Sequence, residues 1–248
     1  MSNPSVFKTL SGHRLAYHKV DGAGPTVIWC GGLKSDMEGS KALHLHSWAK
    51  DAGRAYIRFD YFGHGVSDGE FTDGTISRWA GDVLDMIDHV ADGDVILVGS
   101  SMGGWASLLA ATARPKRVQA LVLINPAPDF TQKLTYASFS DIQREDLERD
   151  GVVYLPSDYD EPYAYSKALI DDGRARQILD APINFDGPVR ILQGMSDDVV
   201  PPEYSRRIMD VIRSEDATYT LVKGGDHSLS RPQDLALLVR SLDGLLIT

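Results

Sequence analysis

Cysteine is almost absent from this sequence, whose 248 residues include only Cys30. No disulfide can form within the chain, and a reducing compartment is compatible with the composition. Long hydrophobic runs are missing too, since no stretch approaches the roughly 18 apolar residues of a membrane span. The first ten residues lack the apolar core of a secretory signal. We therefore expect a soluble, cytoplasmic protein without integral membrane association.

Positive charge is in deficit, because 25 lysines and arginines face 35 aspartates and glutamates, a net charge of -10. This balance does not suit a polyanionic partner, so we expect neither nucleic acid nor an anionic membrane surface. Known cofactor motifs are absent as well. The chain has no Walker loop, EF-hand, cysteine-rich zinc pattern or H-E-x-x-H sequence. We predict no cofactor and no metal.

What is present is an alternation of strand-like and helix-like segments along one large domain, residues 1–248. The alternation predicts an α/β fold, with a mostly parallel sheet covered by helices on both faces. The first two strands are expected to form a hairpin. The predicted strands lie at residues 6–10, 14–20, 26–30, 55–59, 95–98, 118–124, 189–193 and 218–222. The predicted helices cover residues 42–50, 75–90, 105–114, 203–213 and 234–242.

Residues 126–187 break this rhythm. They are rich in acidic residues and contain several prolines, with short helical patterns at 141–149 and 163–170. Because they lie between two predicted strands, we expect a small lid inserted over one edge of the sheet. Its aromatic side chains either line the cleft or pack the lid onto the body: Phe130, Tyr136, Phe139, Tyr159, Tyr163 and Tyr165.

The sharpest chemical signal is the G-x-S-x-G pattern at residues 99–103. It follows a predicted strand and precedes a helix, which is the context of a nucleophile elbow. Glycines let the flanking chain approach closely there, and the helix amides point at the place where negative charge develops. Ser101 is the predicted nucleophile. Ser100 is the neighbouring alternative, expected to make only local hydrogen bonds, and a plain Gly-Ser turn is the simpler reading of the pattern.

A serine nucleophile needs a base and an acid, in the chain order Ser, acid, His. His227 follows the last predicted strand and is the candidate base, whereas the other six histidines are expected to be packed or solvated. The acid is expected after the next-to-last strand, where Asp197 and Asp198 are adjacent. We predict Asp197, which lies three residues past Gly194, with Asp198 as the alternative.

Two backbone amides are expected to form an oxyanion hole. The first belongs to Met102, directly after the nucleophile, and the second to Leu33, in the glycine-rich loop after the strand at residues 26–30. Cys30 ends that strand and is predicted to be a small buried hydrophobe. Residues 60–67 resemble a D-x-x-G-x-G-x-S loop, in which Asp60 is expected to bond loop amides.

Taken together, these motifs resemble the α/β-hydrolase superfamily of serine hydrolases. Over nearly the whole chain the sequence is also similar to a mitochondrial group described both as acyl-glucuronide esterases and as palmitoyl-protein thioesterases. The resemblance implies the same Ser101, Asp197 and His227 and an acyl-thioester or acyl-glucuronide substrate. It also implies the mitochondrial matrix, if a transit peptide has been removed. The segments that carry it are residues 34–37, 41–43, 58–61, 67–69, 96–105, 113–115 and 194–201.

The predicted function is hydrolysis of a carboxylic ester or acyl thioester through an acyl-serine intermediate, on a small-molecule or acylated-protein substrate. Two alternatives stay open. A catalytic triad of Ser101, Asp197 and His227 also supports carbon–carbon hydrolysis of a diketone-type substrate. In addition, some receptors of this fold bind a ligand without turnover. Dehalogenation is disfavoured, because it needs an aspartate where Ser101 stands.

Overall fold

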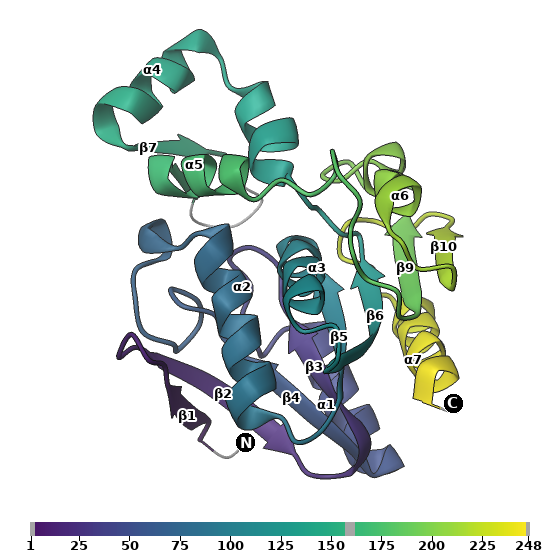
Figure 1. Ribbon diagram of the computed structural model, residues 1–248. Coiled ribbons are helices and arrows are strands. Elements are labelled where there is room, and N and C mark those ends of the chain that lie inside the picture. The colour runs from purple at the N-terminus through teal and green to yellow at the C-terminus, as the bar shows by residue number, and fades with distance from the viewer. Residues whose placement is uncertain (1–2, 157–161, 247–248) are drawn as a thin grey trace.

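The computed structural model describes residues 3–156 and 162–246, and an eight-stranded sheet runs through its centre (Figure 1). The second strand of the chain is antiparallel to both of its neighbours in this sheet, and every other neighbouring pair in the sheet is parallel. The predicted N-terminal hairpin and the mostly parallel sheet are confirmed. In spatial order the strands are β1 (Ser5–Lys8), β2 (Arg14–Val20), β4 (Arg54–Phe59), β3 (Ala23–Cys30), β5 (Val95–Ser100), β6 (Val118–Ile124), β9 (Val189–Gly194) and β10 (Ala217–Val222).

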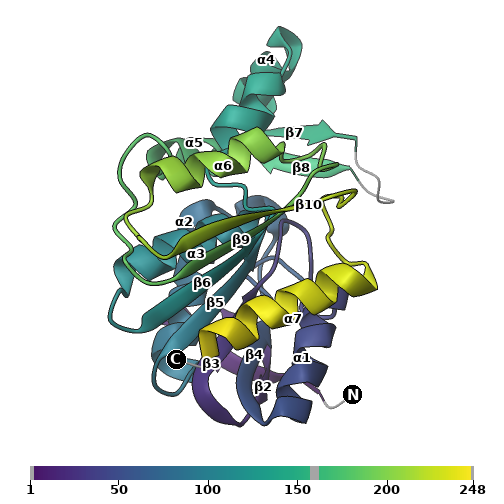
Figure 2. The ribbon, with the colours of Figure 1, turned by 90° about the vertical axis from the view of Figure 1, so that its right-hand side faces the viewer.

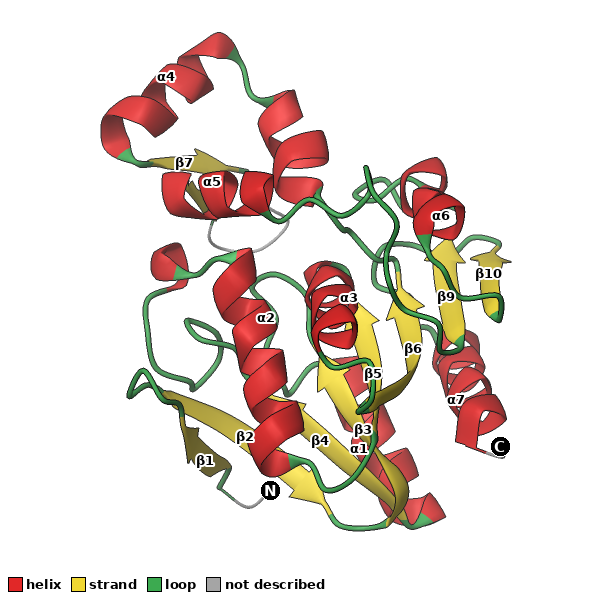
Figure 3. Cartoon of the chain, viewed as in Figure 1, coloured by secondary structure: helices red, strands yellow, loops and turns green. Residues whose placement is uncertain are grey.

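Helices cover both faces of this sheet, as Figures 2 and 3 show. Helices α1 and α7 lie on one face, and α2, α3 and α6 pack on the other. Their bounds are α1 (Ser40–Ala52), α2 (Ile76–Asp85), α3 (Met102–Ala113), α6 (Pro202–Val211) and α7 (Pro232–Leu246), with short turns η1 (Phe71–Asp73) and η2 (Met86–Val90). None of the helices in the described ranges is both long and apolar enough to cross a membrane.

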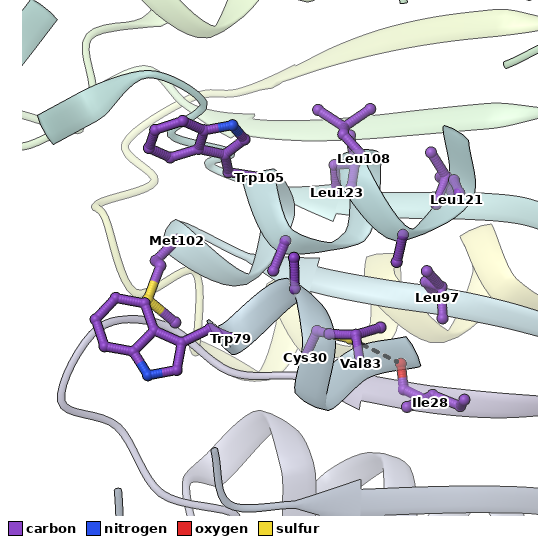
Figure 4. Packing of buried hydrophobic residues seen from close by; sticks show 14 of the residues in the cluster. Ile28, Cys30, Trp79, Val83, Leu97, Met102, Trp105, Leu108, Leu121 and Leu123 are labelled. Atoms are coloured by element: carbon purple, nitrogen blue, oxygen red, sulfur yellow. Dashed lines mark hydrogen bonds between the residues drawn. The ribbon is translucent and has the colours of Figure 1, made fainter. Parts of the chain in front are cut away.

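Two apolar layers hold the helices to the sheet. Trp79 of α2 and Trp105 of α3 are fully buried members of the layer on one face (Figure 4). Leu45 of α1 and Leu242 of α7 are equally buried on the other face. Because both faces are covered, the central strands contain continuous apolar runs, such as residues 95–98 of β5 and 120–124 of β6.

The insertion, described over residues 126–156 and 162–187, leaves the sheet between β6 and β9, and its elements form a smaller unit above the ends of the strands (Figure 1). Within these described residues a short antiparallel hairpin and three helical pieces build that unit. Its own apolar cluster joins Phe139, Leu147, Val153 and Ile170. The elements are η3 (Thr131–Tyr136), α4 (Asp141–Asp150), β7 (Val152–Leu155), β8 (Tyr163–Ser166) and α5 (Lys167–Ala175).

One prediction within the insertion is wrong. The helix expected over residues 163–170 begins only at Lys167, and Tyr163–Ser166 is strand β8. Pairing with β7 decides this, because Tyr165 lies opposite Val153 in the hairpin and the two side chains share one face. The helix expected over residues 141–149 is confirmed as α4.

Candidate active site

Ser101 lies on the sharp turn between β5 and α3. Its backbone has φ 53° and ψ -118°, a conformation that strains any residue with a side chain. The turn is held from both sides. The Ser101 N–H donates to the carbonyl of Ile124 at 3.0 Å, and the Ser101 carbonyl accepts from Gly104 N–H at 2.9 Å. The predicted strand–turn–helix context is therefore present.

The two glycines of the motif are explained by close backbone contacts. A Cβ atom on Gly103 would lie 2.1 Å from the carbonyl oxygen of Cys30, and one on Gly99 would lie 2.5 Å from the carbonyl oxygen of Gly103. Neither contact is tolerable, so α3 packs against β3 and β5 only because these side chains are absent.

His227 and Asp197 complete a hydrogen-bonded chain with this serine. His227 Nε2 lies 3.1 Å from Ser101 Oγ, and His227 Nδ1 lies 2.8 Å from Asp197 Oδ2. The Asp197 side chain is fully buried, and its Oδ1 accepts the N–H groups of Val199 and Val200 at 3.0 and 2.8 Å. Asp198, the alternative acid, is exposed. The structure thus brings together the three residues that the sequence selected.

The loop that carries His227 has a support that the sequence did not indicate. Lys41 of α1 donates its ammonium to the carbonyl of Ser228, directly after His227. Burial lowers the pKa of Lys41 to about 8, although the nearby carboxylates of Asp226 and Asp234 favour its charged form. No local pattern marks this lysine, because it lies 187 residues away from its acceptor in the chain.

The loop of the second predicted oxyanion donor lies beside the serine. A Cβ atom on Gly32 would be 3.5 Å from the Cβ of Ser101, and Leu33 follows Gly32 directly. Met102, the first predicted donor, is the first residue of α3. Amides in the first turn of a helix have no acceptor within that helix, and the helix dipole favours negative charge there.

His64 makes hydrogen bonds that hold the loop of Gly32 and Leu33. Its Nε2 accepts the N–H of Lys34, whose backbone is left-handed at φ 58°, with an N–N distance of 3.1 Å. Its Nδ1 lies 3.1 Å from the carbonyl of Phe62, to which it donates. Burial lowers the pKa of His64 to about 4, so the ring is neutral and keeps Nε2 as an acceptor. The sequence indicated only a packed histidine here.

The loop around Asp60 matches its prediction. The Asp60 carboxylate accepts the N–H groups of Met37 and Val66 at 2.7 and 2.9 Å. Its burial raises the pKa of this carboxyl to about 6. Gly63 and Gly65 both have positive φ, at 70° and 50°, which makes the tight turns possible.

Cys30 behaves as a buried hydrophobe, as predicted. Its side chain is fully buried within the layer shown in Figure 4, and burial raises the pKa of its thiol to about 12. A thiol with so little thiolate is a poor nucleophile. Within residues 3–156 and 162–246, no group of three or more His, Cys, Asp or Glu side chains is placed to hold a metal ion.

The predicted lid aromatics separate into two groups. Phe130 packs edge-on against Trp105 of the body, with ring centroids 5.9 Å apart, and Tyr163 lies 6.0 Å from the ammonium of Lys34. Phe139 belongs to the insertion's own cluster, where Tyr136 and Tyr165 pack against it. Tyr159 lies outside the described residues.

Comparison with known proteins agrees with this geometry. Residues 39–237 match the model of the Alpha/beta hydrolase family. The chain belongs to this family. The hydrolase is 40% identical over 234 residues to palmitoyl-protein thioesterase ABHD10, mitochondrial, of Homo sapiens, an alignment that covers 94% of this chain and 76% of the human protein.

Two solved structures resemble this hydrolase over almost its whole length. A protein of Agrobacterium vitis S4 described as a hydrolase superposes with a TM-score of 0.93 at 39% identity, over 99% of this chain and 98% of that one. Alpha/beta hydrolase domain-containing protein 10 from mouse gives a TM-score of 0.90 at 36% identity, over 98% of both chains.

Proposed function

We propose that this hydrolase cleaves acyl thioesters and esters through an acyl-serine intermediate, with Ser101 as the nucleophile. The observation that carries the proposal is the chain of contacts from Asp197 through His227 to Ser101, at 2.8 and 3.1 Å. A serine hydroxyl is a weak nucleophile, and an imidazole within hydrogen-bond reach activates it. A buried carboxylate on the far side of the ring fixes the tautomer that this requires.

The reaction proceeds in two halves. Ser101 Oγ bonds to the acyl carbon while its proton moves to His227 Nε2, and the imidazolium then protonates the departing sulfur or oxygen as its bond to the acyl carbon breaks. Water attacks the acyl-serine, giving one proton to His227, which returns it to Ser101 as the acid leaves. The amides of Met102 and Leu33 stabilise the oxyanion of both tetrahedral intermediates.

The proposed substrates carry an acyl chain on a thioester or ester. The relatives named palmitoyl-protein thioesterases support an acylated protein. The resemblance to acyl-glucuronide esterases supports a small-molecule ester as well.

We propose that the insertion is a lid over Ser101 in one domain, and that it forms one wall of the acyl site. The contact of Tyr163 with Lys34, one residue beyond Leu33, supports this role. The proposed chemistry uses no cofactor.

The cellular location is a separate part of the proposal. The human relative is named as a mitochondrial protein. We propose that this chain works inside mitochondria or, in a cell without them, in the cytoplasm. Fractionation of cells that express the tagged chain tests this.

A panel of p-nitrophenyl esters and acyl thioesters of increasing chain length, with one acyl glucuronide, tests the function. We expect turnover of both bond types and covalent labelling of Ser101 by a fluorophosphonate. A protein that is neither labelled nor active would instead favour the ligand-binding alternative. A diketone is added to the panel. Activity confined to that substrate would favour the alternative of carbon–carbon bond hydrolysis.

A further inference from the structure

Asn125 directly follows β6, and its side chain contacts the segments that carry His227 and Asp197 of the candidate triad (Ser101, His227 and Asp197), although the mechanism above does not use it. It is fully buried, and its backbone is left-handed at φ 43°. The side-chain oxygen accepts the N–H of Gly194 at 2.8 Å. The side-chain nitrogen donates to the carbonyls of Asp226 and His227, at 3.0 and 2.7 Å. One acceptor and both donors of the carboxamide are therefore engaged.

These contacts join the two segments that carry the acid and the base. Gly194 ends β9, three residues before Asp197, and His227 lies in the loop after β10. The preceding residue, Ile124, accepts the N–H of Ser101. The consecutive residues Ile124 and Asn125 thus bond the backbone of Ser101, the backbone of His227 and the end of the strand that leads to Asp197.

The bond to the carbonyl of His227 is the one that acts on the base itself. Lys41 bonds the next carbonyl, that of Ser228, and the N–H of Ser196 bonds the carbonyl of Gly225. These contacts hold the loop on either side of the histidine. Asn125 supplies a donor to the carbonyl of His227, at the residue that bears the imidazole.

We propose that Asn125 is a positioning residue, which aligns His227 between Asp197 and Ser101 by bonding the His227 backbone to the end of β9. The inference rests on the proposed function of the triad. Asn125 acts through His227 and does not touch the substrate. Its removal is therefore expected to lower kcat and to leave KM unchanged, since misplacement of a catalytic group by about 1 Å can cost ~100-fold in rate.

Two variants test the proposal. Asn125→Asp keeps the size and the oxygen that faces Gly194, but replaces the donor with an oxygen that faces two carbonyls. Asn125→Gly suits the left-handed backbone and removes the side chain, so it decides the question if the aspartate variant does not fold. We expect kcat to fall ~10- to 100-fold in both, with KM unchanged.

The matched control is Thr26→Val at the opposite end of the sheet. Thr26 is also buried, and the substitution removes one side-chain hydrogen bond, to the carbonyl of Asp92 at 3.2 Å, without approaching the triad. A general loss of stability would affect the control and the Asn125 variants alike. We expect the control to keep the parent kcat.

A substrate-free measurement separates this proposal from the proposed function. The His227 Nδ1 proton shared with Asp197 should give a far-downfield proton NMR signal, assigned by its loss in Asp197→Asn. We expect that signal to shift or broaden in both Asn125 variants and to stay in place in Thr26→Val. An unchanged signal and an unchanged kcat in a folded Asn125 variant would overturn the proposal. A parent that hydrolyses nothing on the panel would refute the proposed function, while the NMR comparison would still decide the role of Asn125.

Discussion

The body and the insertion are held together in different ways. In the body, the candidate triad lies at the ends of buried strands, and its residues are bonded to one another and to neighbouring strands. The insertion has a small apolar cluster of its own, and it joins the body through polar contacts such as Asp172 with Ser77 and through Phe130 and Leu169, which are buried in the body's core layer. The geometry that chemistry requires thus lies at the strand ends, while the part proposed to contact the acyl chain is a separate unit docked on the core.

The largest expected effect tests the body side of this comparison. Ser101→Ala should lower ester and thioester turnover by roughly 10⁴-fold or more, because removal of a triad nucleophile has costs of that order. Thermal unfolding should be nearly unchanged. Ser100→Ala, one residue earlier, is the matched control and should stay active. Near-parent activity in Ser101→Ala would show that the nucleophile is misassigned.

The next effect separates the two adjacent acids. Asp197→Asn should lower kcat by about 10³- to 10⁴-fold, because an amide favours the wrong imidazole tautomer. Asp198→Asn changes an exposed side chain and should stay near the parent. Steady-state kinetics on one p-nitrophenyl ester checks both variants. A larger loss for Asp198→Asn would exchange their roles.

A third prediction concerns stability within the body. Burial raises the pKa of Asp82 to about 7, although its carboxylate accepts the N–H of Phe62 at 2.9 Å. The folded state therefore binds this proton more tightly than the unfolded chain does, so the parent loses stability as the pH rises from about 4 through about 7. Asp82→Asn lacks this titration.

The measurement is urea unfolding of Asp82→Asn and the parent at several pH values across that range. The difference, which is the free energy of unfolding of the variant minus that of the parent, should increase by a few kcal/mol as the pH rises across this range. One unit of pKa shift corresponds to about 1.4 kcal/mol. Asp171→Asn, at an exposed position of α5, is the control and should show a flat difference. A flat difference for Asp82→Asn would contradict the raised pKa.

The attachment of the insertion should show a smaller effect. The Asp172 carboxylate of α5 accepts the N–H of Ser77 at 2.7 Å, in the first turn of α2. Asp172→Ala removes this capping contact and should cost about 1 kcal/mol of unfolding free energy. Asp171→Ala, the exposed neighbour in a surface ion pair, should change it by less than ~0.5 kcal/mol. Equal losses in the two variants would mean that the contact between Asp172 and Ser77 makes no specific contribution to stability.

The smallest effect is expected from the proposed wall of the acyl site. Tyr163→Ala should change the ratio of long-chain to acetate turnover by a few-fold, because Tyr163 lies beside Lys34 next to the oxyanion loop. Tyr154→Ala, on the neighbouring strand and 60% exposed, should keep the parent ratio. A chain-length profile that is the same in both variants would remove Tyr163 from the acyl site.

Local patterns predicted the body well because its elements are long and regular. The apolar run at residues 118–124 coincides with β6, and the glycine at 53 ends α1 in a left-handed conformation. The insertion was harder, because β7 and β8 have four residues each and are strands only through one another. The alternating tyrosines at 163 and 165 were the available signal for β8.

The candidate triad could be selected because its motif and chain order are recognisable, whereas its supports could not. Asn125 bonds Gly194 across 69 residues, and His64 bonds Lys34 across 30. No periodicity or spacing relates such partners before the sheet brings β6 beside β9. A buried asparagine and a buried histidine look in the sequence like any other polar residue near the end of a strand.

The single cysteine can report the opening of the apolar layer in which it is buried. Cys30 lies on β3, with β4 and β5 paired on either side and α3 packed over the strand end. Its side chain belongs to the layer that α2 and α3 cover, so a thiol reagent can reach it only after this layer has opened, and the rate of its modification reports that opening. A serine-directed reagent and a thiol-directed reagent therefore address two different events in the same molecule: the first measures the reactivity of the folded enzyme, and the second reports how often this layer opens.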